Sequence, residues 1–210
     1  SLINSQTDLV YKQVPLVLGG KRQWNYQVKG MDLDRQGTLW VFIAGVGLCQ
    51  WDQESDALLV QDVRFQECNG LLSTPDGAIY LALNTGVYKW HPVKDKQHFV
   101  RFSKPVLHLF LSKNETIWAS TDGDGIYLKL KQIDGFSKTY EAKDGSGLSS
   151  NAVKQVMEDR EGRMWCATLR GGVTILDAKK RSFNVIVPKQ LNPSLKSNFF
   201  VSTFFEESEQ

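Results

Sequence analysis

One short unit recurs four times along this chain of 210 residues, and it constrains the fold more than any other feature. Each copy has a polar residue that opens a turn, a fourth residue that is glycine in three of the copies, and an aromatic residue three positions later. The aromatic residues lie 40, 38 and 47 residues apart, the period expected of a four-stranded propeller blade. The four copies are Asp34–Trp40, Thr74–Tyr80, Ser112–Trp118 and Asp159–Trp165.

The agreement extends on both sides of this unit. Apolar residues stand three and six positions before the start of every turn, at 28 and 31, 68 and 71, 106 and 109, and 153 and 156. After the aromatic residue, a glycine followed by a branched apolar residue recurs as Gly47-Leu48, Gly86-Val87, Gly125-Ile126 and Gly172-Val173. Short apolar segments joined by polar, glycine-containing turns are typical of antiparallel strands in hairpins. Each unit therefore predicts three strands, and weaker segments predict a fourth at 63–65, 99–102, 137–140 and 183–187.

The predicted fold is all-β, a β-propeller built of four-stranded antiparallel blades. No stretch with helical periodicity interrupts the units, so a parallel sheet with crossover helices is excluded. Residues 1–22 lack the unit and are expected to supply an outer strand of a neighbouring blade, through 9–11 and 16–18. The propeller repeats span 23–210, with units around 28–65, 68–102, 106–140 and 153–187 and a truncated unit at 201–210 that repeats only the first strand.

We therefore expect an incomplete propeller fragment, with about four blades and the first strand of a fifth. Four units close a ring only at the low end of the usual blade number. An open propeller exposes strand edges that invite pairing with another chain. The isolated chain is predicted to self-associate, or to pair with the remaining blades of a longer parent protein.

The charge of the chain is balanced, with a formal net charge of +2 and Lys and Arg scattered singly or in pairs. The lack of a basic stripe argues against nucleic-acid binding. No apolar run reaches the roughly 18 residues of a membrane span, and the first residues lack a signal-peptide pattern. Cys49, Cys68 and Cys166 are odd in number and widely spaced, which favours buried thiols over a disulfide or metal framework. No cofactor or metal site is predicted.

The full unit closely resembles the two-component-regulator propeller repeat. Its most complete copy spans 147–173 and includes Asn151, Gly162 and Trp165. The resemblance covers roughly residues 23–210, and departures from it include Tyr80 in place of Trp and Glu115 in place of Gly.

This resemblance implies a parent protein of a particular kind. It would be a hybrid two-component sensor whose periplasmic propellers detect oligosaccharides and drive a histidine kinase and a DNA-binding domain. None of those output modules lies in these residues. The fragment itself is therefore expected to sense a ligand and to catalyse nothing.

The aromatic column of Trp40, Trp118 and Trp165 invites a sugar-stacking hypothesis, because indole rings pack well on pyranose faces. A residue that recurs once per blade at one strand position is instead typical of the core between blades. Trp24 lies outside the column and is the better ligand candidate.

Polar residues at the links between second and third strands form a second set of candidates. These links and the connections between blades lie at the same end of the predicted blades, which in propellers commonly holds the ligand. Residues 122–125 lack the downstream acidic ligand of a calcium loop, so a solvated turn is the alternative for their carboxylates. The ligand candidates at this end are Asn84, Asp122, Asp124, Asn151 and Arg170.

No catalytic constellation is evident. His91, His98 and His108 have no metal-ligand spacing, and Ser149-Ser150 has no nucleophile-elbow context. The predicted function is an extracytoplasmic ligand-sensing propeller segment of a hybrid two-component sensor, which detects an oligosaccharide and reaches the membrane only through the rest of its parent. The alternatives are a protein-binding scaffold propeller and a propeller lyase or hydrolase.

Overall fold

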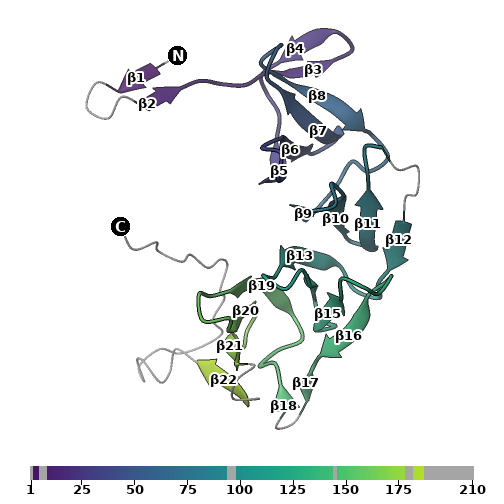
Figure 1. The fold of residues 1–210 in the computed structure, drawn as a ribbon, viewed down its shortest axis with the longest axis vertical. Coiled ribbons are helices and arrows are strands. Elements are labelled where there is room, and N and C mark those ends of the chain that lie inside the picture. The colour runs from purple at the N-terminus through teal and green to yellow at the C-terminus, as the bar shows by residue number, and fades with distance from the viewer. Residues whose placement is uncertain (1, 5–8, 94–97, 144–145, 178–181, 187–210) are drawn as a thin grey trace. The chain divides into compact units, whose positions relative to one another are not determined.

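A computed structural model describes residues 2–4, 9–93, 98–143, 146–177 and 182–186 (Figure 1). All regular structure in these ranges is β-strand. The chain divides into two compact units, Ser1–Cys68 and Asn69–Gln210. In the described part of the chain no helix has the length and apolarity needed to cross a membrane.

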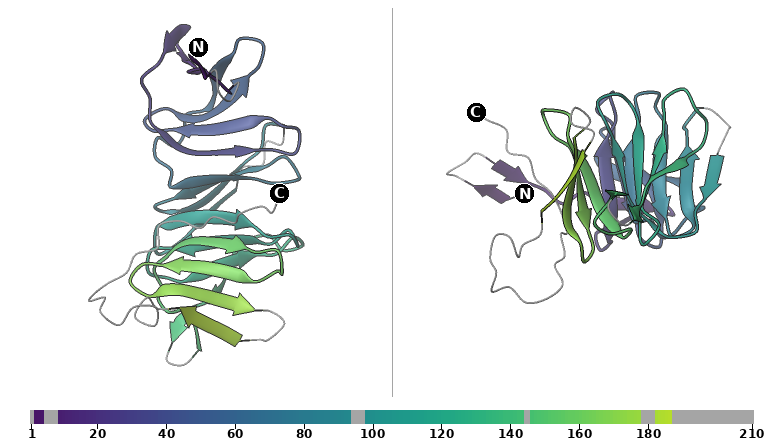
Figure 2. Two further views of the ribbon diagram at one scale, coloured as in Figure 1. Left: turned by 90° about the vertical axis from the view of Figure 1, so that its left-hand side faces the viewer. Right: turned by 90° about the horizontal axis from the view of Figure 1, so that it is seen from below.

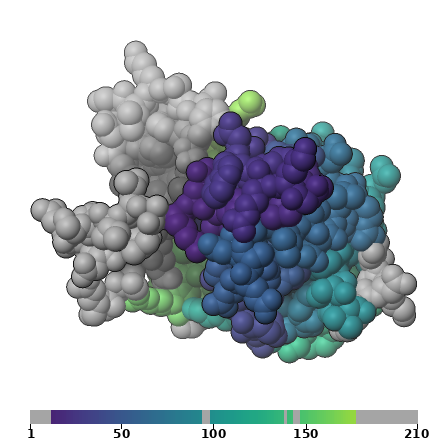
Figure 3. Space-filling model, turned by 90° about the horizontal axis from the view of Figure 1, so that it is seen from above, coloured from purple at the N-terminus to yellow at the C-terminus, as the bar shows by residue number. Residues whose placement is uncertain are grey.

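The first unit contains the first blade and strands that precede it. Its six-stranded sheet has the order β4-β3-β8-β7-β6-β5. Strand β3 lies parallel to β8, and all the other pairs in the sheet are antiparallel. Strand β4 is exposed on the surface of this unit (Figure 3, purple). The strands are β3 (Leu16–Leu18), β4 (Lys21–Gln23), β5 (Val28–Leu33), β6 (Leu39–Ile43), β7 (Gly47–Asp52) and β8 (Ala57–Asp62), and β1 (Leu2–Asn4) pairs with β2 (Leu9–Tyr11) in a separate hairpin.

Residues 16–18 thus add a strand to the first blade itself. Leu16 is fully buried, in a cluster with Val41, Ile43 and Leu58. Residues 9–11 instead pair within the N-terminal hairpin. Residues 16–18 and 21–23 therefore extend the sheet of the first blade beyond β8.

The fourth strand of the first blade is β8 (Ala57–Asp62), and the prediction of a strand at 63–65 was wrong. The reason is a tight turn after β7. Asp52 Oδ2 accepts hydrogen bonds from the backbone nitrogen of Ser55 at 2.8 Å and from its hydroxyl. This turn sends the chain straight back, so that pairing with β7 starts at Ala57.

The second unit contains three four-stranded antiparallel sheets, each built in chain order (Figure 2). They correspond to the second, third and fourth predicted blades, so the all-β propeller class is confirmed. The truncated repeat at 201–210 lies outside the described residues. The strands are β9 (Gly70–Ser73), β10 (Ile79–Leu83), β11 (Gly86–Trp90) and β12 (His98–Arg101); β13 (Val106–Leu111), β14 (Ile117–Thr121), β15 (Ile126–Lys129) and β16 (Ser137–Tyr140); and β19 (Val153–Glu158), β20 (Met164–Thr168), β21 (Gly172–Asp177) and β22 (Ser182–Ile186), with the short hairpin β17 (Ala142–Lys143) and β18 (Ser146–Gly147) between the last two blades.

The apolar columns of the repeat form the core between these blades. Val106 and Leu109 on β13 are buried in a cluster with Tyr80 of the second blade. Val153 and Val156 on β19 are buried in the same way against Trp118 of the third blade. Burial of apolar surface between successive blades therefore explains why the columns recur. The buried residues Cys49, Cys68 and Cys166 form no disulfide.

The repeated Asp and Trp are linked by a hydrogen bond across the turn. The indole nitrogen of Trp40 donates to Asp34 Oδ2 at 2.9 Å, and that of Trp165 donates to Asp159 Oδ2 at 2.8 Å. Burial by itself would raise the pKa of Asp159, but hydrogen bonds from Trp165 and Arg163 outweigh it and lower that pKa to about 2. The carboxylate therefore stays charged and holds the ring in place.

The third turn keeps this geometry although it lacks glycine. The backbone nitrogen of Glu115 donates to the carbonyl oxygen of Ser112 at 2.8 Å, as Gly37 donates to Asp34 at 3.0 Å. Glu115 has a φ of 61°, the left-handed conformation that costs an ordinary residue free energy. Its carboxylate is paired with Lys131 at 2.8 Å. The departure from glycine thus leaves the turn intact.

We predict that His108 makes the second unit sensitive to acid. The backbone nitrogen of Val156 donates to His108 Nδ1 at 3.5 Å, and burial, with a smaller contribution from Lys154, lowers the pKa of His108 to about 4. Between pH 6.5 and 4 the unfolded chain binds a proton at this site that the folded chain does not, so stability falls as pH falls. From pH 7 to pH 5 the loss should be about 1–2 kcal/mol.

The measurement is urea unfolding at the two pH values. In His108→Gln this part of the acid loss should disappear, whereas the control His98→Gln, at an exposed position on β12, should keep it. Equal acid losses in both variants would contradict the prediction.

Candidate functional site

Five of the six predicted ligand candidates lie at one end of the blades of the second unit. We call this end the connection face. It comprises Asn69, residues 84–85, 103–105, 122–125, 149–152 and 169–171, which are the links between second and third strands and the connections between blades. The five candidates there are Asn84, Asp122, Asp124, Asn151 and Arg170.

Two of these candidates hold neighbouring loops together. Asn84 Oδ1 accepts a hydrogen bond at 2.9 Å from the side-chain amide of Asn69. That same amide nitrogen donates to the carbonyl oxygen of Val106 at 2.8 Å, which joins the second blade to the third. Asp124 Oδ2 accepts from the hydroxyl of Ser103 at 2.6 Å.

Asn151 has a similar structural part in the connection to the fourth blade. Its side-chain oxygen accepts from the backbone nitrogen of Ala142, and its carbonyl oxygen accepts from the backbone nitrogen of Gly125 at 2.8 Å. The contact with Ala142 explains why an amide suits this position, because its oxygen satisfies a backbone donor that would otherwise be unpaired.

Asp122 and Arg170 differ from the other three candidates. Both are exposed, and neither side chain has a hydrogen bond or an ion pair within the described ranges. Arg170 has a φ of 74°, and strained residues of this kind cluster at functional sites. Of the connection-face candidates, these two can offer a carboxylate and a guanidinium to a ligand.

Trp24 lies in the first unit, between β4 and β5. Its side chain is 48% exposed, and its carbonyl oxygen accepts from the side chain of Gln13 at 2.9 Å. The structure therefore leaves about half of this side chain exposed to solvent.

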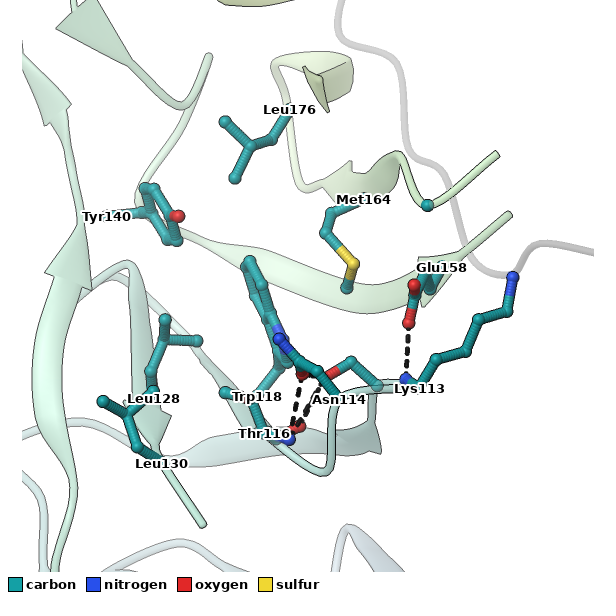
Figure 4. A pocket seen from close by; sticks show the side chains of 12 residues that line it. Lys113, Asn114, Thr116, Trp118, Leu128, Leu130, Tyr140, Glu158, Met164 and Leu176 are labelled. Atoms are coloured by element: carbon teal, nitrogen blue, oxygen red, sulfur yellow. Dashed lines mark hydrogen bonds between the residues drawn. The ribbon is translucent and has the colours of Figure 1, made fainter. Parts of the chain in front are cut away.

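A pocket of about 350 Å³ lies between the third and fourth blades, at the turn end of the strands (Figure 4). None of the six ligand candidates predicted from the sequence lines it. Apolar side chains from both blades form most of its walls, and a polar side opens next to the turn that starts at Ser112. The residues that line it include Asn114, Trp118, Leu128, Tyr140, Glu158 and Met164.

The ring of Trp118 has a different environment from its counterparts in the first and fourth blades. Ser112 stands where they have Asp, and its hydroxyl lies 2.6 Å from Asn114 Oδ1 and 2.9 Å from the carbonyl oxygen of Thr116. The indole nitrogen of Trp118 makes no hydrogen bond to any described residue. The ring stacks on Tyr140 instead, with centroids 5.4 Å apart and an interplanar angle of 7°.

Lys113 and Glu158 close one wall of the pocket. Glu158 Oε2 accepts from the backbone nitrogen of Lys113 at 2.7 Å. The ammonium group of Lys113 donates to the carbonyl oxygen of Asp159 at 2.7 Å. These hydrogen bonds join the turn of the third blade to that of the fourth, and they occupy the ammonium group of Lys113.

A second pocket of about 340 Å³ occupies the equivalent place between the second and third blades. Its walls carry ion pairs, with Lys89 3.3 Å from Asp76 and Lys131 2.8 Å from Glu115. Burial alone would raise the pKa of Asp76, but the Thr74 hydroxyl and Lys89 outweigh it and lower that pKa to about 2.

A signal for both pockets is present in the sequence. They lie at the two copies of the unit in which the opening Asp is replaced, by Thr74 and by Ser112. In neither copy is there a turn carboxylate at that position to bind the aromatic ring. Both pockets therefore coincide with departures from the repeat.

The comparisons with known proteins fit this architecture. Residues 147–170 match the family model of the two component regulator propeller. The chain carries a two-component-regulator propeller repeat. No curated protein sequence matches the chain.

Solved structures share the fold of this repeat protein at low sequence identity. One is the extracellular domain of a protein assigned as a hybrid two component system, BT3049 of B. thetaiotaomicron, with a TM-score of 0.76 and 17% identity over 98% of this chain. Another is PorZ, a surface component of the type-IX secretion system of Porphyromonas gingivalis, with a TM-score of 0.65 and 13% identity over 91% of this chain. The chain spans 27% of the first structure and 31% of the second.

Enzymes also use this fold. A gluconolactonase from Xanthomonas campestris has a TM-score of 0.56 and 18% identity, over 77% of this chain and 62% of the enzyme. At these identities the similarity establishes the propeller fold. In the described ranges, no three His, Cys, Asp or Glu side chains gather as metal ligands.

Proposed function

We propose that this chain is a segment of the extracytoplasmic, ligand-sensing propeller of a two-component signal-transduction protein. The observation that carries the proposal is the match of residues 147–170 to the two component regulator propeller. The similarity of nearly the whole chain to the extracellular domain of a hybrid two component system supports it. The segment itself is non-catalytic in this proposal, and the response is generated elsewhere in the parent.

The proposed ligand is an oligosaccharide, as the family resemblance implies. The connection face supports ligand contact of this kind, because Asp122 and Arg170 are exposed and unpaired within the described residues. A carboxylate and a guanidinium together can accept from and donate to sugar hydroxyls. Nearby loops are fixed by the hydrogen bonds of Asp124 and Asn151, so these side chains stand on a rigid base.

Calorimetric titration of the chain with a panel of oligosaccharides tests the proposal. At least one sugar should release or absorb heat on binding. Asp122→Asn and Arg170→Gln should each weaken binding about threefold to tenfold, because each removes a charged hydrogen-bonding partner. The control Glu161→Gln, exposed at the turn end of the fourth blade, should bind as the unchanged chain does.

A protein-binding scaffold is the second candidate function, and one observation favours it. Val28 and Met31 on β5 are 45% and 68% exposed, whereas their counterparts in the third and fourth blades are almost fully buried. An exposed apolar strip of this kind is typical of a surface that contacts protein. Absence of heat with every sugar, together with concentration-dependent association in sedimentation, would support this candidate and contradict the sensing proposal.

A further inference from the structure

The pocket between the third and fourth blades has the chemistry of a binding site. We propose that it binds one neutral, polyhydroxylated ring, the end residue of an oligosaccharide, with Trp118 and Asn114 as its hydrogen-bond donors. This proposal rests on the proposed sugar-sensing function, but it places a site at the turn end of the strands, opposite the connection face. The pocket volume of about 350 Å³ is at the small end for ligand pockets and suits a single ring.

Internal comparison between the blades identifies the first donor. In the first and fourth blades, Asp34 and Asp159 accept the indole N–H of the repeated Trp. In the third blade Ser112 replaces the Asp and turns toward its own loop, which leaves the N–H of Trp118 without a partner in the described ranges. Local departures from an otherwise consistent pattern are expected at functional sites. A polar group next to a cavity is normally satisfied by water or by a ligand.

Asn114 supplies the second donor. Its side-chain oxygen is occupied by the turn, because it accepts from the Ser112 hydroxyl at 2.6 Å and from the backbone nitrogen of Thr116 at 3.2 Å. This orientation leaves the amide nitrogen of Asn114 pointing away from the turn contacts and without a hydrogen bond among the described residues. The turn therefore fixes the amide so that it presents donors at the polar side of the pocket (Figure 4).

The remaining walls decide the class of ligand. Leu128, Met164 and Leu176 present apolar surface, and Trp118 and Tyr140 add aromatic edges (Figure 4). One carboxylate oxygen of Glu158 accepts a hydrogen bond from the backbone nitrogen of Lys113, and the other accepts from no described residue. A sugar ring has an apolar C–H face that can pack on the apolar and aromatic walls. Its hydroxyls can accept hydrogen bonds from the two donors and donate to the Glu158 carboxylate. A purely aromatic ligand would leave the two donors and the carboxylate unsatisfied.

The arrangement of charges at the pocket favours a neutral ligand over an anionic one. The ammonium group of Lys113 is bound to backbone carbonyl oxygens of the fourth blade, at 2.7 Å for Asp159 and 3.3 Å for Arg160. Glu158 carries a negative charge at the wall of the pocket. A carboxylated or sulfated sugar would face this carboxylate, while the Lys113 ammonium group keeps its charge but directs its donors at those carbonyl oxygens, so we expect neutral sugars to be preferred.

Nuclear magnetic resonance of the full chain tests the proposal, because it detects weak binding at individual indole groups. The chain has six Trp residues, and Trp118→Phe identifies the Trp118 signal by its loss. Titration with glucose, galactose or mannose should shift the Trp118 signal in a saturable way. Glucuronate and free indole are the comparison probes, and both should bind at least threefold more weakly than the best neutral sugar.

Asn114→Asp is the decisive variant. It keeps the side-chain oxygen that the turn needs, and the second blade already has Asp76 in the same place, where it contacts the Thr74 hydroxyl at 2.6 Å. The variant should therefore fold normally and bind the sugar about threefold to tenfold more weakly. The control is His98→Gln, a polar change at an exposed position on the outer strand β12, outside both proposed sites, which should leave the Trp118 shift unchanged.

Two results would overturn the proposal. Sugar binding that shifts other signals and is weakened by Asp122→Asn alone would place the site on the connection face, and the sensing function would stand without this pocket. Absence of any shift with every neutral sugar, in a chain with a well-dispersed spectrum, would remove the pocket as a sugar site. If oligosaccharides also gave no heat in calorimetry, the sensing function would fail with it.

Discussion

Trp118→Ala is expected to lower the free energy of unfolding of the second unit by about 3–5 kcal/mol, the range for truncation of a buried aromatic side chain. The ring is 7% exposed and stacks on Tyr140. It also packs in one cluster with Val153 and Met164 of the fourth blade. Alanine would leave a cavity at the junction of two blades, next to an existing pocket. Urea unfolding followed by circular dichroism measures the change.

Phe99→Ala is the control in the same unit. Phe99 lies on the outer strand β12 and is 38% exposed, so its truncation should cost about 1 kcal/mol or less. Similar losses in the two variants would show that Trp118 is not part of the core between blades. Trp118→Phe keeps most of the packing and removes the N–H, which is why it serves the binding experiment.

Much of the fold could be predicted because the information is repeated and local. Val106 and Leu109 face the second blade and Val153 and Val156 face the third, so the same contact dictates the same residue type in both copies. The turn of Asp34 is equally local, since its carboxylate binds groups two to six residues away. Periodic burial and short-range hydrogen bonding therefore leave a readable pattern.

Contacts between distant segments left no such pattern. Strand β3 pairs in parallel with β8, some 40 residues later, and nothing in the repeat specifies that pairing. The prediction that residues 16–18 form an outer strand did not identify which blade they join. The tight turn at Asp52 that moves the fourth strand of the first blade is a single-copy feature, so the repeat could not reveal it.

The candidate site was likewise predictable where it depends on the repeat and unpredictable where it depends on contacts between distant segments. Chain topology was enough to bring Asn84, Asp122, Asp124, Asn151 and Arg170 to one end of the blades. The sequence could not distinguish side chains that hold loops together from side chains that face solvent, because the partners belong to other loops. The replacement of Asp by Ser112 is visible in the sequence, but the missing partner of the Trp118 indole and the space beside it depend on how the third and fourth blades pack.

Gly125→Ala is expected to lower the free energy of unfolding by about 2–4 kcal/mol, through left-handed backbone strain and a steric clash together. Gly125 has a φ of 75°, and a Cβ placed on it would lie 2.1 Å from the carbonyl oxygen of Tyr140. That oxygen belongs to the end of the fourth strand, so the backbone of two strands must separate to admit a methyl group. The same approach occurs at Gly86, where the Cβ would lie 2.0 Å from the carbonyl oxygen of Val100.

Gly77→Ala separates the two causes. Gly77 has a φ of 79°, nearly that of Gly125, but the nearest heavy atom to its added Cβ is 3.7 Å away, an ordinary contact. Its substitution should therefore cost only the backbone term, about 1–2 kcal/mol. An excess loss in Gly125→Ala would show that close packing of the third and fourth strands requires the glycine that recurs after each aromatic residue. Equal losses of stability would show that the left-handed backbone conformation alone explains why this glycine recurs.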